Sequence, residues 1–396
     1  MNTVLKNAVL HTLAHLIDQN TTQLVQANTL DANAYQGDDQ ALYDRLLVND
    51  KKIEGMVQSV LQVMAQDDPV GRELYRFTHD NQMEVVNRSA PFGTIFIIYE
   101  SRPDVTIEAA ILAFKAGNKI ILKGGKEAKN SNLLLVNLWH QALETHGLSK
   151  NWVTYLDMPR QEVQAFLKAP DRPIDLIVPR GGERLIAFVK AHARCPVLVS
   201  GRGNNYIYID AEADLEMATQ IILSAKTSKI SACNALDKVL IHQNIPHIND
   251  FIEQLIGKLS NAGVEIYASP ALAVANATVN AVQDENIWYE EFLAMKIAFK
   301  TIANAPEAIA WINKYSGGHS ASIITANANT AQQFMEEVDA AAVYHNASTR
   351  FTDGGQFGLG AELAISTDKL HHRGPLGLNH LVSNKWYIKG TGQVRG

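Results

Sequence analysis

The sequence predicts an α/β fold with two parallel-sheet domains and a small protruding hairpin. From Pro91 onward, short strands that are apolar throughout alternate with helical segments, which is typical of a parallel sheet covered on both faces. A second set of alternating strands and helices follows Cys233 and predicts a second α/β unit. The polar, strand-like stretch at 72–91 predicts the hairpin. A chain of 396 residues is long enough for two or three domains.

The first α/β unit follows a helical region. Apolar residues recur at helical spacing over 4–66, so we expect only helices there. Strands and helices then alternate, starting with a strand, at 93–100, 106–117, 118–125, 131–147, 174–180, 183–193 and 195–200.

The second unit also consists of alternating strands and helices. We expect helices at 248–263 and 305–318, and strands at 264–268, 292–302 and 320–326. The segment 346–396 is rich in glycine, and its end at 384–396 is typical of an edge strand.

Composition excludes several classes of protein. A net charge of -6 without a basic cluster gives no reason to expect nucleic acid. We find no apolar stretch near the roughly 18 residues of a membrane span and no apolar signal core at the N-terminus. Two cysteines are too few for a disulfide framework or a four-cysteine metal site, and the histidines lack metal-ligand spacing. We therefore expect a cytoplasmic protein with reduced thiols, no metal, no nucleic acid and no membrane partner.

Two pairs of glycines mark the edge where a parallel sheet binds ligands, beyond the carboxyl ends of its strands. Gly124 and Gly125 follow one predicted strand, and Gly181 and Gly182 follow another. Each pair alone is typical of a tight turn. Two pairs at one edge, each beside a cation, favour a dinucleotide or phosphate site, because the backbone can approach an anion closely. The Rossmann pattern G-x-G-x-x-G is absent from the sequence.

The two cysteines differ in their surroundings. Cys195 lies in an apolar run and is typical of a buried thiol. Cys233 has polar residues before it, and we expect a helix after it. A helix N-terminus can lower a thiol pKa from ~8.5 toward ~3.5–7.5, and such a thiolate could attack an acyl or aldehyde carbon. Burial of Cys233 as a small apolar residue remains the alternative from these residues alone.

Four stretches resemble a branch of the aldehyde dehydrogenase superfamily whose members reduce an acyl phosphate. The resemblance extends from about residue 4 to the C-terminus, and the last stretch is the most specific. The stretches are APFGTIFIIYESRPDVTIEAAILAFKAGNKIILKGGKEA, DLIVPRGGERLI, AKTSKISACNALDKVLIH and VYHNASTRFTDGGQFGLGAELAISTDKLHHRGPLGL.

The resemblance implies an aldehyde dehydrogenase-like architecture. Its cofactor-binding domain would span 1–225 and its catalytic domain 226–365. The segment 366–396 would return to the hairpin at 75–90 and complete an oligomerisation element, so a homo-oligomer, a dimer or a tetramer, is expected.

The resemblance also implies an activity. Cys233 would attack the small-molecule substrate L-glutamyl 5-phosphate, and NADPH would reduce the resulting thioester to L-glutamate 5-semialdehyde, a step of proline biosynthesis. A glutamate 5-kinase would be the natural protein partner.

Site residues follow from matching these motifs. Arg102 and Arg350 are substrate candidates because a guanidinium pairs bidentately with carboxylate and phosphate; a structural ion pair is an equal alternative for each. Lys126 stands where many NAD-dependent members carry a ribose-binding glutamate, which favours NADPH over NADH. The substrate set is Arg102, Asn346, Ser348 and Arg350, and the cofactor set is Lys123, Gly124, Gly125, Lys126, Arg180, Gly181, Gly182 and Glu291.

Two alternatives stay open at this stage. A hydrolytic aldehyde dehydrogenase would need a general base, usually a glutamate in the segment that here reads SGRGNNYIYID, where the nearest polar residues are the amides Asn204 and Asn205. A non-catalytic binding protein on the same fold would be expected to lose Cys233 or the cofactor motifs. The superfamily's oxyanion-binding asparagine is also missing from the loop YESRPD, which leaves the backbone N–H of Cys233 as one candidate donor.

Overall fold

The computed structural model describes residues 1–273, 278–369 and 372–395, and the chain divides into two compact units. Unit 1 comprises 1–199, 358–364 and 376–396, and unit 2 comprises 200–357 and 365–375. The boundary expected near 225 coincides with the end of helix α9 (Leu215–Thr227). In the structure α9 packs in unit 2, so the chain enters that unit about 25 residues earlier.

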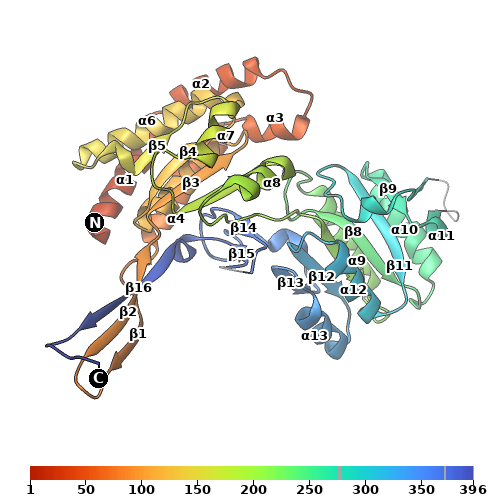
Figure 1. The fold of residues 1–396 in the computed structure, drawn as a ribbon. Coiled ribbons are helices and arrows are strands. Elements are labelled where there is room, and N and C mark those ends of the chain that lie inside the picture. Colours follow the sequence, from red (N-terminus) through yellow and green to blue (C-terminus); the bar gives the residue numbers. More distant parts are fainter. Residues whose placement is uncertain (274–277, 370–371, 396) are drawn as a thin grey trace. The chain divides into compact units, whose positions relative to one another are not determined.

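Unit 1 is built on a four-stranded parallel sheet (Figure 1). Its strand order is β5-β4-β3-β6, with β3 at Thr94–Tyr99, β4 at Lys119–Lys123, β5 at Val153–Tyr155 and β6 at Leu176–Arg180. Alternate residues of β3 enter different cores, because successive side chains of a strand point to opposite faces. Ile95 and Ile97 join one buried cluster, and Phe96 and Ile98 join the other.

Helices cover both faces of this sheet. One face packs against the N-terminal helices and the crossover helices, and the other packs against two shorter helices. The first group is α1 (Thr3–Gln19), α2 (Thr21–Ala34), α4 (Asp50–Ala65), α5 (Pro103–Lys115) and α6 (Lys129–Thr145), and the second is α7 (Arg160–Lys168) and α8 (Glu183–His192). The helical region predicted at 4–66 is confirmed, and it also holds α3 (Gln40–Leu46).

The strand expected at 195–200 is wrong. Only one isolated bridge forms there, between Ile177 and Val197. Pro196 lacks a backbone N–H, so this stretch cannot continue a ladder of hydrogen bonds along β6.

The predicted hairpin is confirmed. Strands β1 (Glu73–Thr78) and β2 (Glu84–Pro91) pair antiparallel, and the C-terminal strand β16 (Val382–Lys389) pairs with β2 on its other side. Figure 1 shows β16 returning from the far end of the sequence to lie beside this hairpin. The edge strand expected near the C-terminus is therefore present.

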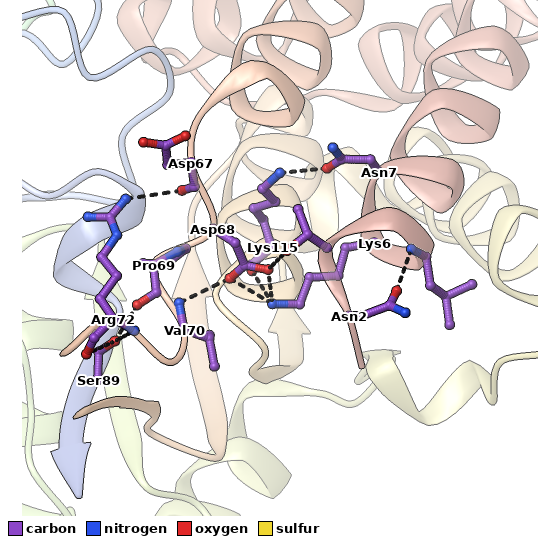
Figure 2. Close-up of polar contacts among 12 residues, drawn as sticks. Asn2, Lys6, Asn7, Asp67, Asp68, Pro69, Val70, Arg72, Ser89 and Lys115 are labelled. Carbon is purple, nitrogen blue, oxygen red and sulfur yellow. Dashed lines mark hydrogen bonds and ion pairs between the residues drawn. The ribbon is translucent and has the colours of Figure 1, made fainter. Parts of the chain in front are cut away.

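A buried ionic cluster fastens the base of this hairpin to the helices (Figure 2). The ammonium of Lys6 donates to both carboxylate oxygens of Asp68, at 3.0 and 2.8 Å, and to the carbonyl of Lys115 at 2.8 Å. The Val70 N–H donates to the same carboxylate at 3.0 Å. Burial alone raises the pKa of Asp68, but the hydrogen bonds from Lys6 and Val70 outweigh it and hold that pKa below its usual range.

Unit 2 is built on a seven-stranded parallel sheet in the order β10-β9-β11-β8-β7-β12-β13. Helices α9 and α10 (Ile248–Asn261) pack on one face, and α12 (Ala305–Tyr315) and α13 (Ala328–Glu337) pack on the other. A short antiparallel pair, β14 (Ile365–Ser366) and β15 (Gly374–Pro375), also belongs to this unit. The strands of the main sheet are β7 (Asn205–Ile209), β8 (Leu236–His242), β9 (Glu265–Ala268), β10 (Asn280–Ala281), β11 (Lys296–Ile302), β12 (Ser320–Ile324) and β13 (Ala342–His345).

Candidate active site

Cys233 lies in the turn that joins α9 to β8 in unit 2. The helix expected after Cys233 is wrong, because strand β8 follows it and α9 comes before it. All seven residues of β8 are buried, and the strand pairs with β7 and β11 in the middle of the sheet. The sequence expectation that a helix N-terminus directly after Cys233 lowers its thiol pKa is therefore not supported by the fold.

The nucleophile turn is fastened to the loop at 348–352. The hydroxyl of Thr349 donates to the Asn234 carbonyl at 2.9 Å, and the Asn234 amide donates to the carbonyls of Arg350 and Thr352 at 3.2 and 2.9 Å. Thr349 and Thr352 are fully buried. Asn234, the residue after Cys233, therefore holds the loop that contains Arg350 through these hydrogen bonds.

Arg350 is the cation of this site. Its Nε donates to the Ser228 hydroxyl at 3.1 Å. Burial lowers the pKa of the Arg350 guanidinium, while the charges of Cys233 and Asp353 act in the opposite direction. The guanidinium is therefore close enough to Cys233 to interact with its charge, and a neighbouring cation favours the thiolate form of a cysteine.

Ser228, Asn234 and Arg350 are among the residues that line an open pocket of about 310 Å³. Its polar lining consists of hydroxyl and amide groups, the Arg350 guanidinium and the Asp353 carboxylate, and the guanidinium is the group that can bind an anionic oxygen-rich ligand. The sequence predicted Ser348 and Arg350 but missed the others, although two of them, Ser228 and Asn234, stand within six residues of Cys233. The lining residues are Ser224, Ser228, Asn234, Ser348, Arg350, Phe351, Asp353 and Gln356.

Two predicted substrate residues shape the loop that carries Arg350. Asn346 has a left-handed backbone conformation, with φ 54°, and its side-chain amide bonds both the N–H and the carbonyl of Thr325 at 3.0 Å. Ser348 accepts a hydrogen bond from the Arg350 N–H at 3.3 Å and also lines the pocket. Asn346 thus anchors the loop, whereas Ser348 belongs to both the loop and the pocket.

Glu291 lies beside the nucleophile turn. A Cβ atom placed on Gly203 would come within 2.0 Å of the Cys233 carbonyl oxygen and 2.6 Å of Glu291 Oε1. Only glycine fits between these two groups. Within unit 2, the predicted cofactor residue Glu291 therefore lies near the backbone of Cys233.

The other cofactor candidates gather at the carboxyl edge of the sheet in unit 1. Strands β4, β3 and β6 are neighbours; Lys123 ends β4, Arg180 ends β6, and the substrate candidate Arg102 follows the end of β3. A Cβ on Gly124 would lie 2.2 Å from the Asn132 side chain, and a Cβ on Gly125 would lie 2.7 Å from the Glu127 carboxylate. Only glycine fits at either position, because the protein's own side chains occupy the space that a Cβ atom would need.

The two lysines of this edge differ in exposure. Lys123 is half-buried and donates to the Gly124 carbonyl at 2.6 Å. Burial lowers the pKa of its ammonium, partly offset by the charges of Asp157 and Glu127. Lys126 is exposed at the first position of the 3₁₀ turn η1 (Lys126–Ala128), where its ammonium is available to an anion in solvent.

In the second glycine pair, Gly181 and Gly182, the turn already binds a carboxylate of the same chain. The Gly182 N–H, at the start of α8, donates to Glu100 Oε1 at 2.8 Å. A Cβ on Gly181 would lie 2.7 Å from the same oxygen. A phosphate binding at this turn would have to displace the Glu100 carboxylate.

Arg102 lies in a charged cluster of unit 1. Its guanidinium forms an ion pair with Asp104 at 3.4 Å. Burial and the Asp104 charge together raise the pKa of Glu108 to about 7. The ion-pair role that the sequence left open for Arg102 is thus present in the structure.

Across the described residues, no cluster of three or more His, Cys, Asp or Glu side chains has the arrangement of a metal site. None of the helices in the described segments has the length and apolar character needed to span a bilayer.

Comparison with known proteins identifies the family. The aldehyde dehydrogenase family model matches residues 1–275 and 269–361. Gamma-glutamyl phosphate reductase of Aquifex aeolicus is 43% identical over 407 residues, covering 100% of this chain and 92% of the relative. The enzyme of that name from Enterococcus faecalis is 42% identical, covering 100% and 94%. The crystal structure of gamma-glutamyl phosphate reductase from Thermotoga maritima superposes with a TM-score of 0.93 at 39% identity, covering 100% of this chain and 95% of that one. This chain belongs to the aldehyde dehydrogenase family, as a member of its gamma-glutamyl phosphate reductase branch, an oxidoreductase that uses a nicotinamide cofactor.

Proposed function

We propose that this enzyme reduces L-glutamyl 5-phosphate to L-glutamate 5-semialdehyde with NADPH, through a thioester on Cys233. The observation that carries the proposal is the placement of Cys233 and Arg350 on one turn-and-loop assembly, beside a pocket that Arg350 lines together with several hydroxyl and amide groups. The names of the relatives support the substrate.

The chain's own groups perform the acyl transfer. The Cys233 thiolate attacks the acyl carbon of the substrate, forming a C–S bond and a tetrahedral oxyanion. The Cys233 N–H is our candidate donor to this oxyanion. As the oxyanion collapses, the carbon–oxygen bond to phosphate breaks, the guanidinium of Arg350 stabilises the departing phosphate, and the phosphate takes up a proton from solvent to leave as the dianion.

The thioester is then reduced. NADPH, when bound, supplies the hydride that adds to the thioester carbon. Collapse of the second oxyanion breaks the C–S bond, releases the aldehyde and regenerates the Cys233 thiolate. Lys123 and Lys126 would hold the adenosine end of the cofactor, and Glu291 would hold a ribose near the reacting carbon. The same lysines support the preference for NADP over NAD.

A hydrolytic aldehyde dehydrogenase is the second candidate, and one observation favours it. The Glu291 carboxylate lies beside the nucleophile turn, where a base could activate water against the thioester. Against this, the residues at the expected position of the base are Asn204 and Asn205, whose amide nitrogens already donate to backbone carbonyls. We therefore assign Glu291 to the cofactor and not to water.

The reverse reaction separates the two functions. Purified enzyme with L-glutamate 5-semialdehyde and NADP should form NADPH only when phosphate or arsenate is present, because nothing else cleaves the thioester. Robust NADPH formation in buffer free of both anions would support hydrolysis and contradict the proposal. A protein that binds NADP but forms no NADPH under either condition would be a binding protein.

The proposal extends to assembly and location. The sheet β1-β2-β16 exposes large apolar side chains, including Leu74, Tyr75, Phe77 and Trp386, and we infer that a second copy of the chain covers them. We also infer a cytoplasmic enzyme, where Cys195 and Cys233 stay reduced, and one that receives its unstable acyl phosphate from a glutamate 5-kinase.

A further inference from the structure

Two adjacent buried asparagines lie where strand β7 begins, and both donate to backbone carbonyls outside that strand. Asn204 and Asn205 are each fully buried. Asn205 is the first residue of β7, and both follow Gly203, the glycine packed between Cys233 and Glu291. Their amides bind different segments, and each segment carries one of the proposed functional residues.

The Asn205 amide holds the nucleophile turn. Its Nδ2 lies 2.7 Å from the Cys233 carbonyl, 2.7 Å from the Ala235 carbonyl and 2.8 Å from the Gly203 carbonyl. Three carbonyl oxygens fix the orientation of the amide, because its own oxygen would be repelled there. One side chain therefore spans Cys233 and the residue two positions further on.

The Asn204 amide holds the segment that leads to Glu291. Its Nδ2 donates to the Trp288 carbonyl at 2.6 Å and to the Tyr315 carbonyl at 2.9 Å. The Tyr206 hydroxyl donates to the same Trp288 carbonyl at 2.6 Å. Trp288 ends the 3₁₀ turn η3 (Glu285–Trp288), three residues before Glu291.

Burying these two amides is less favourable than burying apolar side chains of the same size. Among the described residues, no donor reaches the Oδ1 atom of Asn204 or of Asn205, and both atoms are buried. A buried acceptor without a donor is unfavourable, and apolar side chains would fill the same space without it. The retained amides point to a positional function of their nitrogen atoms.

We propose that Asn204 and Asn205 are positioning residues with separate tasks: Asn205 sets the nucleophile turn, and Asn204 sets the Glu291 segment. This inference rests on the proposed function, because it assigns catalysis to Cys233 and cofactor contact to Glu291. It goes further by dividing the two tasks between two neighbouring side chains at the start of β7.

Replacement by leucine removes the amide and keeps the size of each side chain. In a Cys195→Ala background, Asn205→Leu should slow alkylation of Cys233 by iodoacetamide and lower kcat by about a hundredfold, as expected for a misplaced reacting group. Its KM and Kd for NADPH should stay near those of the parent. Asn204→Leu should weaken NADPH binding about tenfold, read by cofactor fluorescence, and leave the alkylation rate unchanged.

Two further sets of variants keep the test decisive. Asn204→Ser and Asn205→Ser retain a small donor and should show weaker forms of the same two patterns if the leucine variants fail to fold. Asn118→Leu is the matched control, because Asn118 is equally buried in unit 1 and bonds the Gly93 N–H and the Leu381 carbonyl. It should lower the melting temperature without changing the alkylation rate.

The outcomes separate this inference from the proposed function. Folded Asn205 variants with parental alkylation and kcat would overturn the assignment, as would equal losses of alkylation and NADPH binding in both positions. The alkylation rate and the Kd for NADPH are both measured without turnover. If the parent enzyme itself shows no phosphate-dependent NADPH formation, the proposed function fails whatever the asparagine variants do.

Discussion

The Thr349 hydroxyl donates a hydrogen bond to the backbone carbonyl of Asn234, with 2.9 Å between the two oxygens. This bond joins two segments more than a hundred residues apart in the sequence, and both are buried at the point of contact. The position of Arg350 relative to Cys233 therefore depends on a single hydroxyl group as well as on the Asn234 amide.

Thr349→Val tests that dependence, because valine keeps the shape and removes the hydroxyl. The Asn234 carbonyl would lose its donor, which costs about 1–3 kcal/mol of unfolding free energy. We expect a lower urea midpoint and a lower kcat/KM for the acyl phosphate. A variant with full kcat/KM would show that the loop is held adequately by its other bonds.

Cys233→Ala should abolish turnover in both directions and leave the far-ultraviolet circular dichroism unchanged. Cys195→Ala should retain most of the activity, because Cys195 lies in unit 1 and burial raises the pKa of its thiol. Steady-state assays of the two purified variants make the comparison. Appreciable turnover by Cys233→Ala would rule out covalent catalysis at this residue.

Lys126→Glu should narrow or reverse the preference for NADPH over NADH. An ammonium and a 2′-phosphate ~4 Å apart interact by about 4 kcal/mol at an effective dielectric near 20, and a third of that is about tenfold in affinity. Lys129→Glu is the control, since Lys129 is also exposed but pairs with Asp157 at 2.8 Å. Equal KM values for NADPH and NADH in the unmodified enzyme would contradict the role of Lys126.

Arg350→Lys should raise the KM for the acyl phosphate, because an ammonium cannot bind an oxyanion in the bidentate way of a guanidinium. The KM for NADPH should stay the same. Arg102→Lys is the second variant, and the sequence predicts for it the same raised KM for the acyl phosphate and unchanged KM for NADPH. An unchanged KM in that variant would assign Arg102 to its ion pair with Asp104 alone.

Asp68→Asn should destabilise unit 1 by about 3 kcal/mol, because it leaves the buried Lys6 ammonium without a carboxylate. The pKa of Asp68 is lower in the folded protein than in the unfolded chain, so the ionised carboxylate stabilises the fold above its unfolded pKa near 4. That contribution is lost as the pH falls through the folded pKa.

Urea unfolding of the parent protein and the Asp68→Asn variant at a series of pH values measures this effect. The difference in unfolding free energy between the two proteins should be constant near pH 7 and shrink below about pH 4. Glu144→Gln is the control, because its ion pair with Lys150 is about half exposed on both sides and should contribute little. A pH-independent difference for Asp68→Asn would argue against the ionic role.

The sequence predicted the architecture well where long, periodic segments define it. The N-terminal helices, the hairpin and three of the four strands of the unit 1 sheet were expected at the positions found, whereas in the seven-stranded sheet of unit 2 only β9, β11 and β12 were. It missed β5, which has three residues, and α7, whose nine residues are mostly polar. A helix was also expected where β8 lies, because a short buried apolar run has no periodicity that separates strand from helix.

The candidate site was predictable only in part. Motif resemblance selected Cys233 and Arg350, but the bonds that join their segments run between residues far apart in the chain, and local pattern carries no information on them. Ser224 and Gln356 also line the pocket, and no local sequence pattern marks either of them as a site residue. The sequence shows Asn204 and Asn205 only as amides where a base would be needed, and the backbone carbonyls that they bind come from segments that the fold brings together.

The return of β16 to the hairpin has a consequence for synthesis on the ribosome. About 290 residues separate the end of β2 from the start of β16, and unit 2 is made in between. At typical translation rates this takes roughly 15–60 s, during which one edge of β2 has no native partner. An unpaired strand edge recruits other chains, so the nascent protein is most exposed to aggregation before its last fifteen residues emerge.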